Sequence, residues 1–402
     1  MHVYLKLLCL LVCLLCAGCD EGSSADLAMP QTVGDAIIFG SIDSGIDLDG
    51  ALDQTSQMVR TDKVIDGQRV SINNGLGQVS FMVPSNALSI TVIIWGMDDG
   101  WYGIDGWQDE TGYALVPSGW PALEGNEAGC YRCNNFATQS AGVSTTIAPN
   151  RPGALINAGR HVVDIVGWVD GFAADEARVS VLIKQGPIWP ATGTIDLNMY
   201  FTGAQGWTAD SVQADPYFAA CIDRVIDLYG RAGIRLGEIA YHDIDSEFAT
   251  VSIEAGDDSL GRLVGQSVAE PHHGANVFFV DEILTGEIDF PSIPGVAAAV
   301  PSPPLLPGTV ASGVAVATKG PLSVPPGNRF LDPPAIGQTI AHELGHALGL
   351  VHTSEYDGVT HDLFDDTLDD DNRYLMHADG TGAEISAQQI RALMANPVIS
   401  HP

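Results

Sequence analysis

Three histidines fall within eleven positions in the stretch AHELGHALGLVH, which spans residues 341–352. In a helix, His342 and His346 are four residues apart, so their imidazoles leave the same face one turn apart. Gly349 follows three residues after His346, where a residue that accepts a left-handed conformation can end the helix and turn the chain back. His352 then approaches from outside the helix. The stretch therefore predicts three imidazoles around one point.

This pattern indicates a metal site with an open position. Neutral imidazole nitrogens suit Zn²⁺, and three protein ligands with the fourth position left to water are typical of a catalytic zinc. Glu343 stands beside that open position, where a carboxylate can act as general base on the water. We therefore predict that His342, His346 and His352 hold one catalytic Zn²⁺. The alternative is a cluster of helix histidines that binds no metal.

The residues around the histidines agree with a helix. Asp332, followed by two prolines, predicts an N-cap with proline in the first turn. One apolar stripe recurs every four residues and would be buried against a core. The stripe consists of Ile336, Ile340, Leu344 and Leu348. The histidines lie off this stripe, so they remain available to a ligand.

The run His342-Glu343-x-x-His346-x-x-Gly349-x-x-His352 resembles that of the metzincin zinc endopeptidases. Their second mark is a methionine in a tight turn beneath the metal, and Met376, within residues 373–377, is similar to it. An ordinary core methionine is the alternative. Residues 385–394 predict a closing helix with a serine cap, which metzincins commonly have. Over residues 188–402 the resemblance implies an α/β domain with a mixed sheet, an active-site helix and zinc-dependent hydrolysis of peptide bonds.

Departures from the family leave the subfamily open. Astacin-like and serralysin-like members have a tyrosine that can reach the metal two residues after the turn methionine, and this position is Ala378. Thr353, directly after the third histidine, matches no subfamily mark. Archaemetzincins add a cysteine-rich zinc knuckle downstream, whereas no cysteine follows Cys221. We therefore predict no tyrosine ligand to the metal in this protein.

The N-terminus resembles a bacterial lipoprotein signal. A lysine at position 6 precedes an apolar run over residues 7–15 that is too short to span a bilayer. The resemblance implies a signal peptide over residues 1–18, lipidation of Cys19 and a polar tether over residues 19–35. Ordinary secretion is the alternative, because Cys16 stands where leucine is usual.

Residues 36–187 predict an accessory β-sandwich of jelly-roll type. Apolar residues alternate with period two over residues 79–83, 88–94 and 179–183. Turn residues punctuate these runs, as at Asn73-Asn74-Gly75 and Asp98-Asp99-Gly100. Residues 184–190 are interpreted as the linker out of this domain. The sandwich could be a carbohydrate-binding or protein-binding module, or a spacer.

The order of elements in residues 188–402 predicts an α/β layout. A strand over residues 195–201 is followed by a helix over residues 215–229, which Gly230 and Gly233 would end. Further strands are predicted over residues 234–241, 277–283, 296–300 and 314–318. Residues 295–300 have small side chains and are a candidate for the edge strand that pairs with an extended substrate. An ordinary buried strand or loop is the alternative.

The net charge of the chain argues against nucleic acid as a binding partner. The net charge of −33 arises from 50 acidic against 17 basic residues, so nucleic acid would be repelled. The acidic run over residues 365–372 could hold Ca²⁺, which needs several oxygen ligands, although it lacks the spacing of an EF-hand. A solvated acidic loop is the alternative.

The cysteines outside the signal allow several assignments. Cys130 and Cys133 could close a small disulfide beyond the membrane. Their spacing also resembles half of a zinc knuckle or a redox motif, but no second half exists. Latency through a thiolate on the zinc is a further alternative.

These patterns together predict an exported, lipid-anchored zinc endopeptidase of the cell envelope that acts on proteins or peptides. Zn²⁺ would lower the pKa of its bound water to about 7 and polarise the scissile carbonyl, while Glu343 takes the water's proton. The alternative is an inactive or latent zinc-binding adhesion lipoprotein. The sequence predicts no oligomeric state.

Overall fold

The computed structural model describes residues 59–97, 99–118, 139–150, 154–268, 274–287, 291–320, 331–356, 361–367 and 370–401. Residues 58–402 belong to one compact unit. The described chain is mostly β-sheet with few helices. None of its described helices combines the length and apolar character needed to cross a membrane. Cys19, the Cys130–Cys133 pair and the predicted signal and tether lie outside the described residues.

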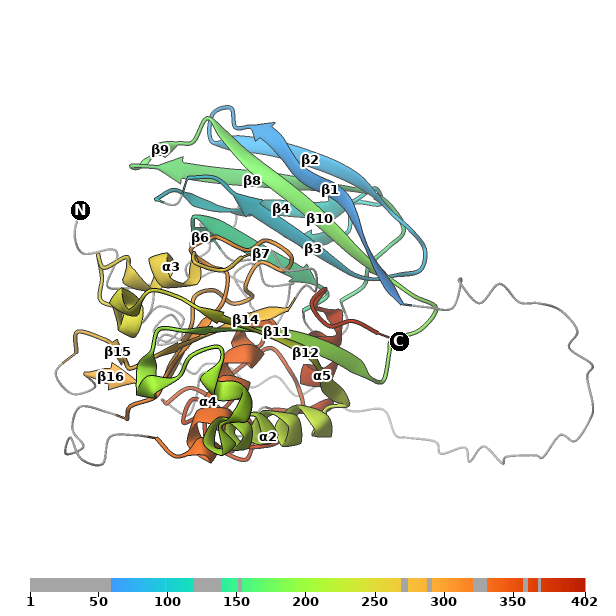
Figure 1. Ribbon diagram of the computed structural model, residues 1–402. Coiled ribbons are helices and arrows are strands. Elements are labelled where there is room, and N and C mark those ends of the chain that lie inside the picture. Colours follow the sequence, from blue (N-terminus) through green and yellow to red (C-terminus); the bar gives the residue numbers. More distant parts are fainter. Residues whose placement is uncertain are drawn as a thin grey trace, which may run out of the picture. The chain divides into compact units, whose positions relative to one another are not determined.

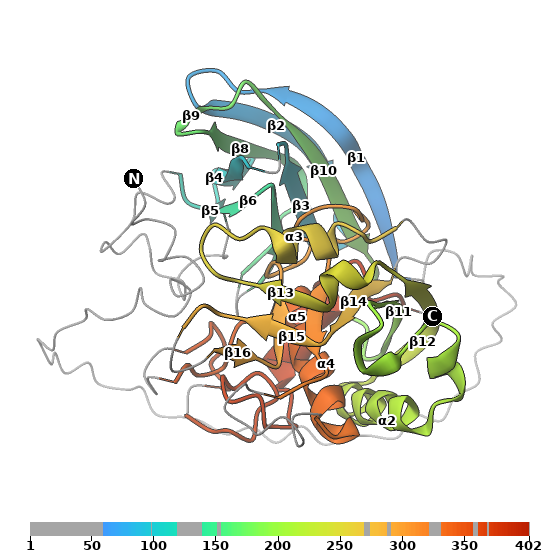
Figure 2. The same cartoon turned by 60° about the vertical axis from the view of Figure 1, so that its left-hand side comes forward.

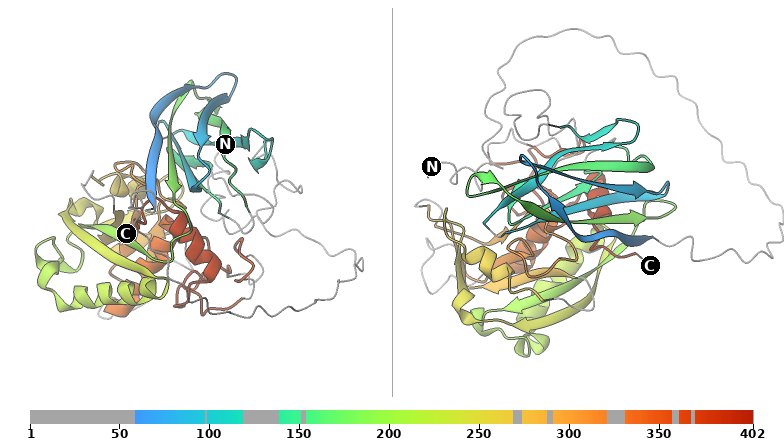
Figure 3. Two further views of the ribbon diagram at one scale, coloured as in Figure 1. Left: turned by 90° about the vertical axis from the view of Figure 1, so that its right-hand side faces the viewer. Right: turned by 90° about the horizontal axis from the view of Figure 1, so that it is seen from above.

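Two antiparallel sheets form the N-terminal part (Figures 1 and 3). The first sheet, called sheet A, has the order β1 (Arg60–Ser71), β10 (Glu176–Gln185), β3 (Ala87–Trp95) and β7 (Val143–Ala148). The second has the order β2 (Leu76–Val83), β8 (Gly159–Val169), β4 (Trp101–Asp109) and β5 (Ala114–Val116), with β6 (Gln139–Ala141) on β4 and β9 (Phe172–Ala173) on β8. A β-sandwich is therefore present, whereas its jelly-roll topology stays a prediction.

The predicted alternation explains how the two sheets meet. In β2 every second side chain is buried, and the residues between them are exposed. Strand residues from both sheets join one core, represented by Val79 on β2, Val92 on β3 and Ile104 on β4. The tight turn before β2 places Asn74 and Gly75 at φ values of 52° and 86°, which these residue types accept.

A five-stranded mixed sheet forms the centre of the C-terminal part. Its order is β12 (Ile234–Asp243), β11 (Gly193–Phe201), β14 (Ala275–Val280), β18 (Val314–Ala317) and β17 (Gly295–Ala297). The first four strands are parallel, and β17 is antiparallel to β18. A small second sheet has the order β13 (Thr250–Ser252), β15 (Glu282–Leu284) and β16 (Ser292–Ile293).

Helices α2 (Pro216–Arg231) and α4 (Pro333–Ala347) share a face of this sheet (Figure 2). Residues of both helices, of β11 and β14, and of α5 (Ala387–Ala395) join one hydrophobic core. The short helix α3 (Ser259–Val264) packs on the opposite face, where Leu263 joins Tyr200 and Phe278 in another core. The sheet is thus covered on both faces, as parallel strands require.

Several predicted boundaries were wrong. The predicted strand over residues 277–283 is two strands, β14 and β15, which pair in different sheets. Helix α2 continues through Gly230 to Arg231, and Gly233, at φ 74°, follows its end. The predicted linker over residues 184–190 is shorter, because Lys184 and Gln185 belong to β10. Lys184 is also buried.

Candidate metal centre

Helix α4 carries two of the predicted ligands, and its local sequence explains its ends. The side chain of Asp332 accepts a hydrogen bond from the Ala335 N–H at 2.9 Å, with proline in the first turn as predicted. The stripe from Ile336 to Leu348 is buried in the core. Gly349 lies just past the helix at φ 108°, a conformation that favours glycine. There the chain turns and brings His352 back toward the helix.

The three predicted histidines come together. Nε2 of His352 lies 3.2 Å from Nε2 of His342 and 3.1 Å from Nε2 of His346. The candidate ligand atoms of all three residues lie within 4.8 Å of one another. Within the described residues, this is the group of histidine, cysteine and acidic side chains that could hold a metal ion.

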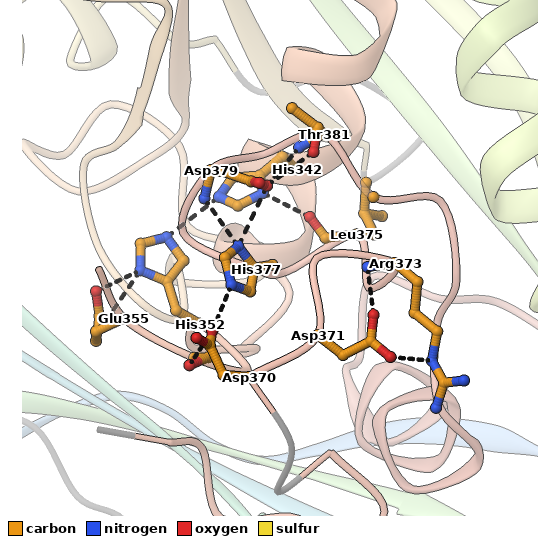
Figure 4. Close-up of polar contacts among 12 residues, drawn as sticks. His342, His352, Glu355, Asp370, Asp371, Arg373, Leu375, His377, Asp379 and Thr381 are labelled. Carbon is orange, nitrogen blue, oxygen red and sulfur yellow. Dashed lines mark hydrogen bonds and ion pairs between the residues drawn. The ribbon is translucent and has the colours of Figure 1, made fainter. Parts of the chain in front are cut away.

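The other ring nitrogens contact hydrogen-bond acceptors. Nδ1 of His342 donates to the Leu375 carbonyl at 2.7 Å, and Nδ1 of His346 donates to the Leu350 carbonyl at 2.8 Å. Because carbonyl oxygens only accept, both protons belong on Nδ1, and each Nε2 keeps a free lone pair. His352 Nδ1 instead contacts Glu355 (Figure 4). Such contacts orient imidazoles that bind metals.

The donor set fits Zn²⁺. A tetrahedral zinc with nitrogens at about 2.0–2.1 Å separates them by roughly 3.3 Å, close to the observed separations. Burial, followed by the charge of His352, lowers the pKa of His342 to about 4, and the same causes lower the pKa of His346 well below its usual value. Both imidazoles are therefore neutral, as metal ligands must be.

Glu343 lies next to His342 on α4, and the edge strand β17 covers it. It is buried, and it accepts a backbone hydrogen bond from Ala297. A Cβ atom on Gly295 would lie 2.7 Å from Glu343 Oε1 and 2.5 Å from a Thr339 methyl carbon, so only glycine allows this approach. Burial raises the pKa of Glu343 to about 8, although the Ala297 hydrogen bond acts in the opposite direction, and the positive charge of a bound Zn²⁺ would favour the ionised carboxylate.

Met376 packs under the same helix. Its side chain is fully buried, and a Cβ atom on Gly345 would lie 2.3 Å from its sulfur. The Met376 carbonyl accepts a hydrogen bond from the Thr353 N–H at 2.8 Å, next to the third histidine. The turn closes with a hydrogen bond of 3.1 Å from the His377 N–H to the Tyr374 carbonyl. Met376 therefore lies between the helix and the segment that carries His352.

The described residues of the acidic run over residues 365–372 accept hydrogen bonds. Asp366 accepts from the Ser386 hydroxyl at 2.8 Å and from the Gln388 N–H at 3.0 Å, at the start of α5. Asp370 contacts His377 at 3.0 Å (Figure 4). Residues 368–369 lie outside the described residues, so calcium binding by the run stays a prediction.

The other histidines also have local partners. Nδ1 of His361 donates to the Thr353 carbonyl at 3.2 Å. His377 contacts both Asp370 and Asp379 (Figure 4). Both residues shape the surroundings of the centre, and neither belongs to the ligand group. The pair His272-His273 lies outside the described residues.

Sequence reasoning missed two features of the centre. Glu355 follows His352 by three residues, and a search for carboxylates near predicted ligands would have found it. Gly295 was included only as part of a candidate strand, and nothing in the sequence indicates its contact with α4. That contact depends on pairing between residues far apart in the chain.

No family model matches the chain, and no curated protein matches it. Among solved structures, it is similar to metalloproteinase-II from Bacteroides fragilis, at 14% identity and a TM-score of 0.29, over 55% of this chain and 63% of that one. It is also similar to a family two carbohydrate esterase from Cellvibrio japonicus, at 10% identity and a TM-score of 0.14, over 46% of this chain and 52% of that one. Each match spans less than two thirds of the other chain. At these TM-scores the similarities establish neither a shared fold nor a shared activity.

Proposed function

We propose that this protein is a zinc-dependent endopeptidase of metzincin type. The observation that carries the proposal is the convergence of three Nε2 atoms beside Glu343, with each Nδ1 oriented by an acceptor. Zn²⁺ bound there supplies a Lewis acid that lowers the pKa of water and polarises a carbonyl. A site that only holds a metal for stability has no need of a carboxylate at position 343.

The other steps of peptide hydrolysis are assigned to side chains of the protein. The Nδ1 contacts hold the three imidazoles in the orientation that binding requires. Glu343 takes a proton from the attacking water and returns it to the nitrogen of the leaving amine. Its hydrogen bond from Ala297 and its packing against Gly295 fix the carboxylate in place, which limits its motion between the two transfers.

The strand next to Glu343 supports a peptide as substrate. β17 is the last strand in its sheet, and among the described strands only β18 pairs with it. Apart from the Ala297 N–H, which donates to Glu343, the backbone groups along its other edge would pair with an extended chain, which would add a strand by β-augmentation. This arrangement favours cleavage within a protein or peptide over cleavage of a small ester or amide.

We also propose that the protein is exported and anchored in the cell envelope through lipidated Cys19, with ordinary secretion as the alternative. The support comes from the signal-like sequence of residues 1–18. A protein or peptide would then be met outside the cytoplasm. The acidic composition supports the expectation that nucleic acid is not a partner.

The decisive experiment compares wild type with Glu343→Ala and His346→Ala, by metal analysis and by hydrolysis of casein and a broad set of peptides. Glu343→Ala should keep about one zinc per chain while hydrolysis falls by about 10²–10⁴-fold, as expected for a lost general base. His346→Ala should lose both metal and activity, because two ligands hold zinc poorly. Mass spectrometry of product ends distinguishes internal from terminal cleavage.

Glu384→Ala serves as the control, because this carboxylate is exposed and its side chain pairs with Arg373. It should match wild type in zinc content and hydrolysis. Undiminished hydrolysis in Glu343→Ala would refute the mechanism. A wild type that binds zinc and cleaves none of the peptides would instead favour a zinc-binding adhesion protein.

A further inference from the structure

Three of the four strands of sheet A, β10, β3 and β7, are buried on both faces over most of their length, whereas the edge strand β1 is largely exposed. A free-standing sandwich does not require such burial. β2 in the opposite sheet alternates buried and exposed residues, as a half-solvated strand does. In contrast, the seven inner residues of β3 and all six of β7 are buried, as are the last seven of β10. Successive side chains point to opposite faces. The outer face of these three strands is therefore covered by another part of the protein.

An apolar contact covers part of the outer face of sheet A. Ile93, Val143 and Leu182 come from neighbouring strands of sheet A, and they cluster with buried Ala311. Ala299, Leu305 and Leu306 pack against this cluster. These partners belong to residues 298–313, the loop that connects β17 with β18, which we call the rim loop. One end of the sheet's outer face thus rests on the segment next to the edge strand.

A polar contact joins the same face to the C-terminal segment. Nζ of Lys184, which is 1% exposed, donates to the carbonyls of Met394 at 2.8 Å, Asn396 at 2.6 Å and Ile399 at 2.9 Å. On β3, the Ser89 hydroxyl donates to the Ala395 carbonyl at 2.6 Å.

This polar contact is costly to break. Separation would break these four hydrogen bonds together, three of them from one amino group that is buried in the interface. Lys184 is 1% exposed, and this burial lowers the pKa of its amino group to about 7. Lys184 therefore forms part of a buried, hydrogen-bonded interface between the sandwich and the C-terminal segment.

The rim loop connects this interface with the metal centre. Ala299 follows Ala297, the Glu343 hydrogen-bond donor, by two residues. The Ser302 N–H donates to the Ala347 carbonyl at 3.0 Å, at the end of the helix that carries two ligands. Pro301 packs against Gly349, and together with Ile147 of the sandwich they line one small cavity. Movement of the sandwich would therefore disturb both the edge strand and the end of α4.

We propose that the β-sandwich is a permanent support of the metal centre: its outer face holds the rim loop, and through it β17 and Glu343, so the domain is not a removable N-terminal extension. The part that concerns Glu343 rests on the proposed function. A removable domain would leave the apolar face of sheet A exposed after cleavage, and soluble proteins rarely expose such patches. The sandwich residues named here are positioning residues, because none of them reaches the metal ligands.

The test cuts the chain between the two parts without removing either. Ile188 is 73% exposed, so a recognition sequence for a site-specific protease is inserted after Pro187 in the full chain. After cutting, the two pieces of wild type should elute together in gel filtration and hydrolyse the peptide substrate as the uncut protein does. Zinc content and melting temperature are measured on the same samples.

Leu182→Asp places a charge in the apolar contact and should separate the cut pieces. In the uncut chain it should lower kcat/KM by up to about 100-fold while zinc remains bound, because a small misplacement of reacting groups has effects of this size. Met82→Asp is the matched control, since Met82 is 64% exposed on β2. It should leave elution, melting temperature and hydrolysis unchanged.

Lys184→Met is the second variant, for use if Leu182→Asp does not fold. It keeps an apolar chain of similar length but removes the three hydrogen bonds, so the cut pieces should dissociate at a lower denaturant concentration than those of wild type. Separation of the cut wild-type pieces without denaturant, with full hydrolysis by the C-terminal piece, would overturn the proposal. So would dissociation in Leu182→Asp without any loss of kcat/KM. Pieces that elute together from a wild type that cleaves no peptide would support the interface and refute the proposed function.

Discussion

Both carboxylate oxygens of Glu355 lie 3.0 Å from Nδ1 of His352. His352 is the proposed ligand that lies outside α4, so no helix geometry fixes its orientation. The other two ligands donate to backbone carbonyls instead. The Glu355 carboxylate therefore fixes the orientation of the His352 imidazole. For His342 and His346, their position on the helix contributes to that orientation.

Replacement of Glu355 should weaken zinc binding. Glu355→Ala removes the acceptor of His352 Nδ1, and changes in such partners cost about 10–100-fold in metal affinity. Glu355→Gln keeps an acceptor oxygen and should lose less. Titration against a competing chelator measures the affinity. Equal zinc affinity in wild type and Glu355→Ala would show that His352 is oriented by other contacts.

A methyl group at position 295 should impair hydrolysis more than metal binding. In Gly295→Ala the new Cβ atom would overlap Glu343 and Thr339, so the carboxylate or β17 must shift. We expect a fall in kcat/KM of about 100-fold at unchanged zinc content. Gly230→Ala is the control, because a Cβ atom there meets nothing within 4 Å. Unchanged kcat/KM in Gly295→Ala would show that the fit between β17 and Glu343 is loose.

Gly345 and Met376 should be energetically coupled. A Cβ atom at position 345 would lie 2.3 Å from the Met376 sulfur, so Gly345→Ala should lower the free energy of unfolding by about 1–3 kcal/mol through overpacking. Met376→Ala removes that clash but opens a cavity. The double variant should therefore lose less stability than the sum of the single losses in denaturant unfolding. Strict additivity would mean that the two side chains do not share this space.

Asp109 should make the sandwich sensitive to acid. Burial alone would raise the pKa of Asp109, but hydrogen bonds from Thr111, Asn157 and Tyr113 lower it from 3.8 to about 2. Because the folded-state pKa is below the unfolded one, Asp109 stabilises the fold above pH 3.8, and this contribution is lost as the pH falls through about 2. Asp109→Asn should therefore be less stable than wild type at neutral pH, and the difference should shrink below pH 3.8.

Melting temperatures of both proteins between pH 2 and pH 7 test this expectation. Asp66→Asn is the control, since Asp66 forms an exposed ion pair with Lys63, and such pairs contribute about 0–1 kcal/mol. A difference between wild type and Asp109→Asn that stays constant over the whole range would contradict the role assigned to the ionised carboxylate.

Cys19→Ala should release the protein from membranes if the lipid anchor exists. Loss of the only anchoring thiol after the signal would move the protein from the detergent-rich phase to the aqueous phase in phase separation. Cys221→Ala is the control, because this buried thiol lies in the core and has no part in anchoring. Wild type that already partitions into the aqueous phase would indicate ordinary secretion.

The sequence by itself determined the local features. The spacing of His342, His346, Gly349 and His352 predicted the ligand group, because a helix places residues four apart on one face. Asp332 and Ser386 predicted the starts of α4 and α5, and both side chains accept the expected backbone hydrogen bonds. These signals lie within a few residues of the structure that they specify, so no knowledge of the fold is needed to read them.

Only the tertiary structure decided the contacts between distant segments. The Leu375 carbonyl that orients His342 and the Gly295 backbone that covers Glu343 are far from α4 in the chain, and neither residue type marks the role. The consecutive apolar residues Val92, Ile93 and Ile94 did carry a signal that β3 is buried on both faces. What covers its outer face could not be predicted, because the packing of the rim loop and Lys184's carbonyl partners depends on three-dimensional proximity and not on sequence spacing.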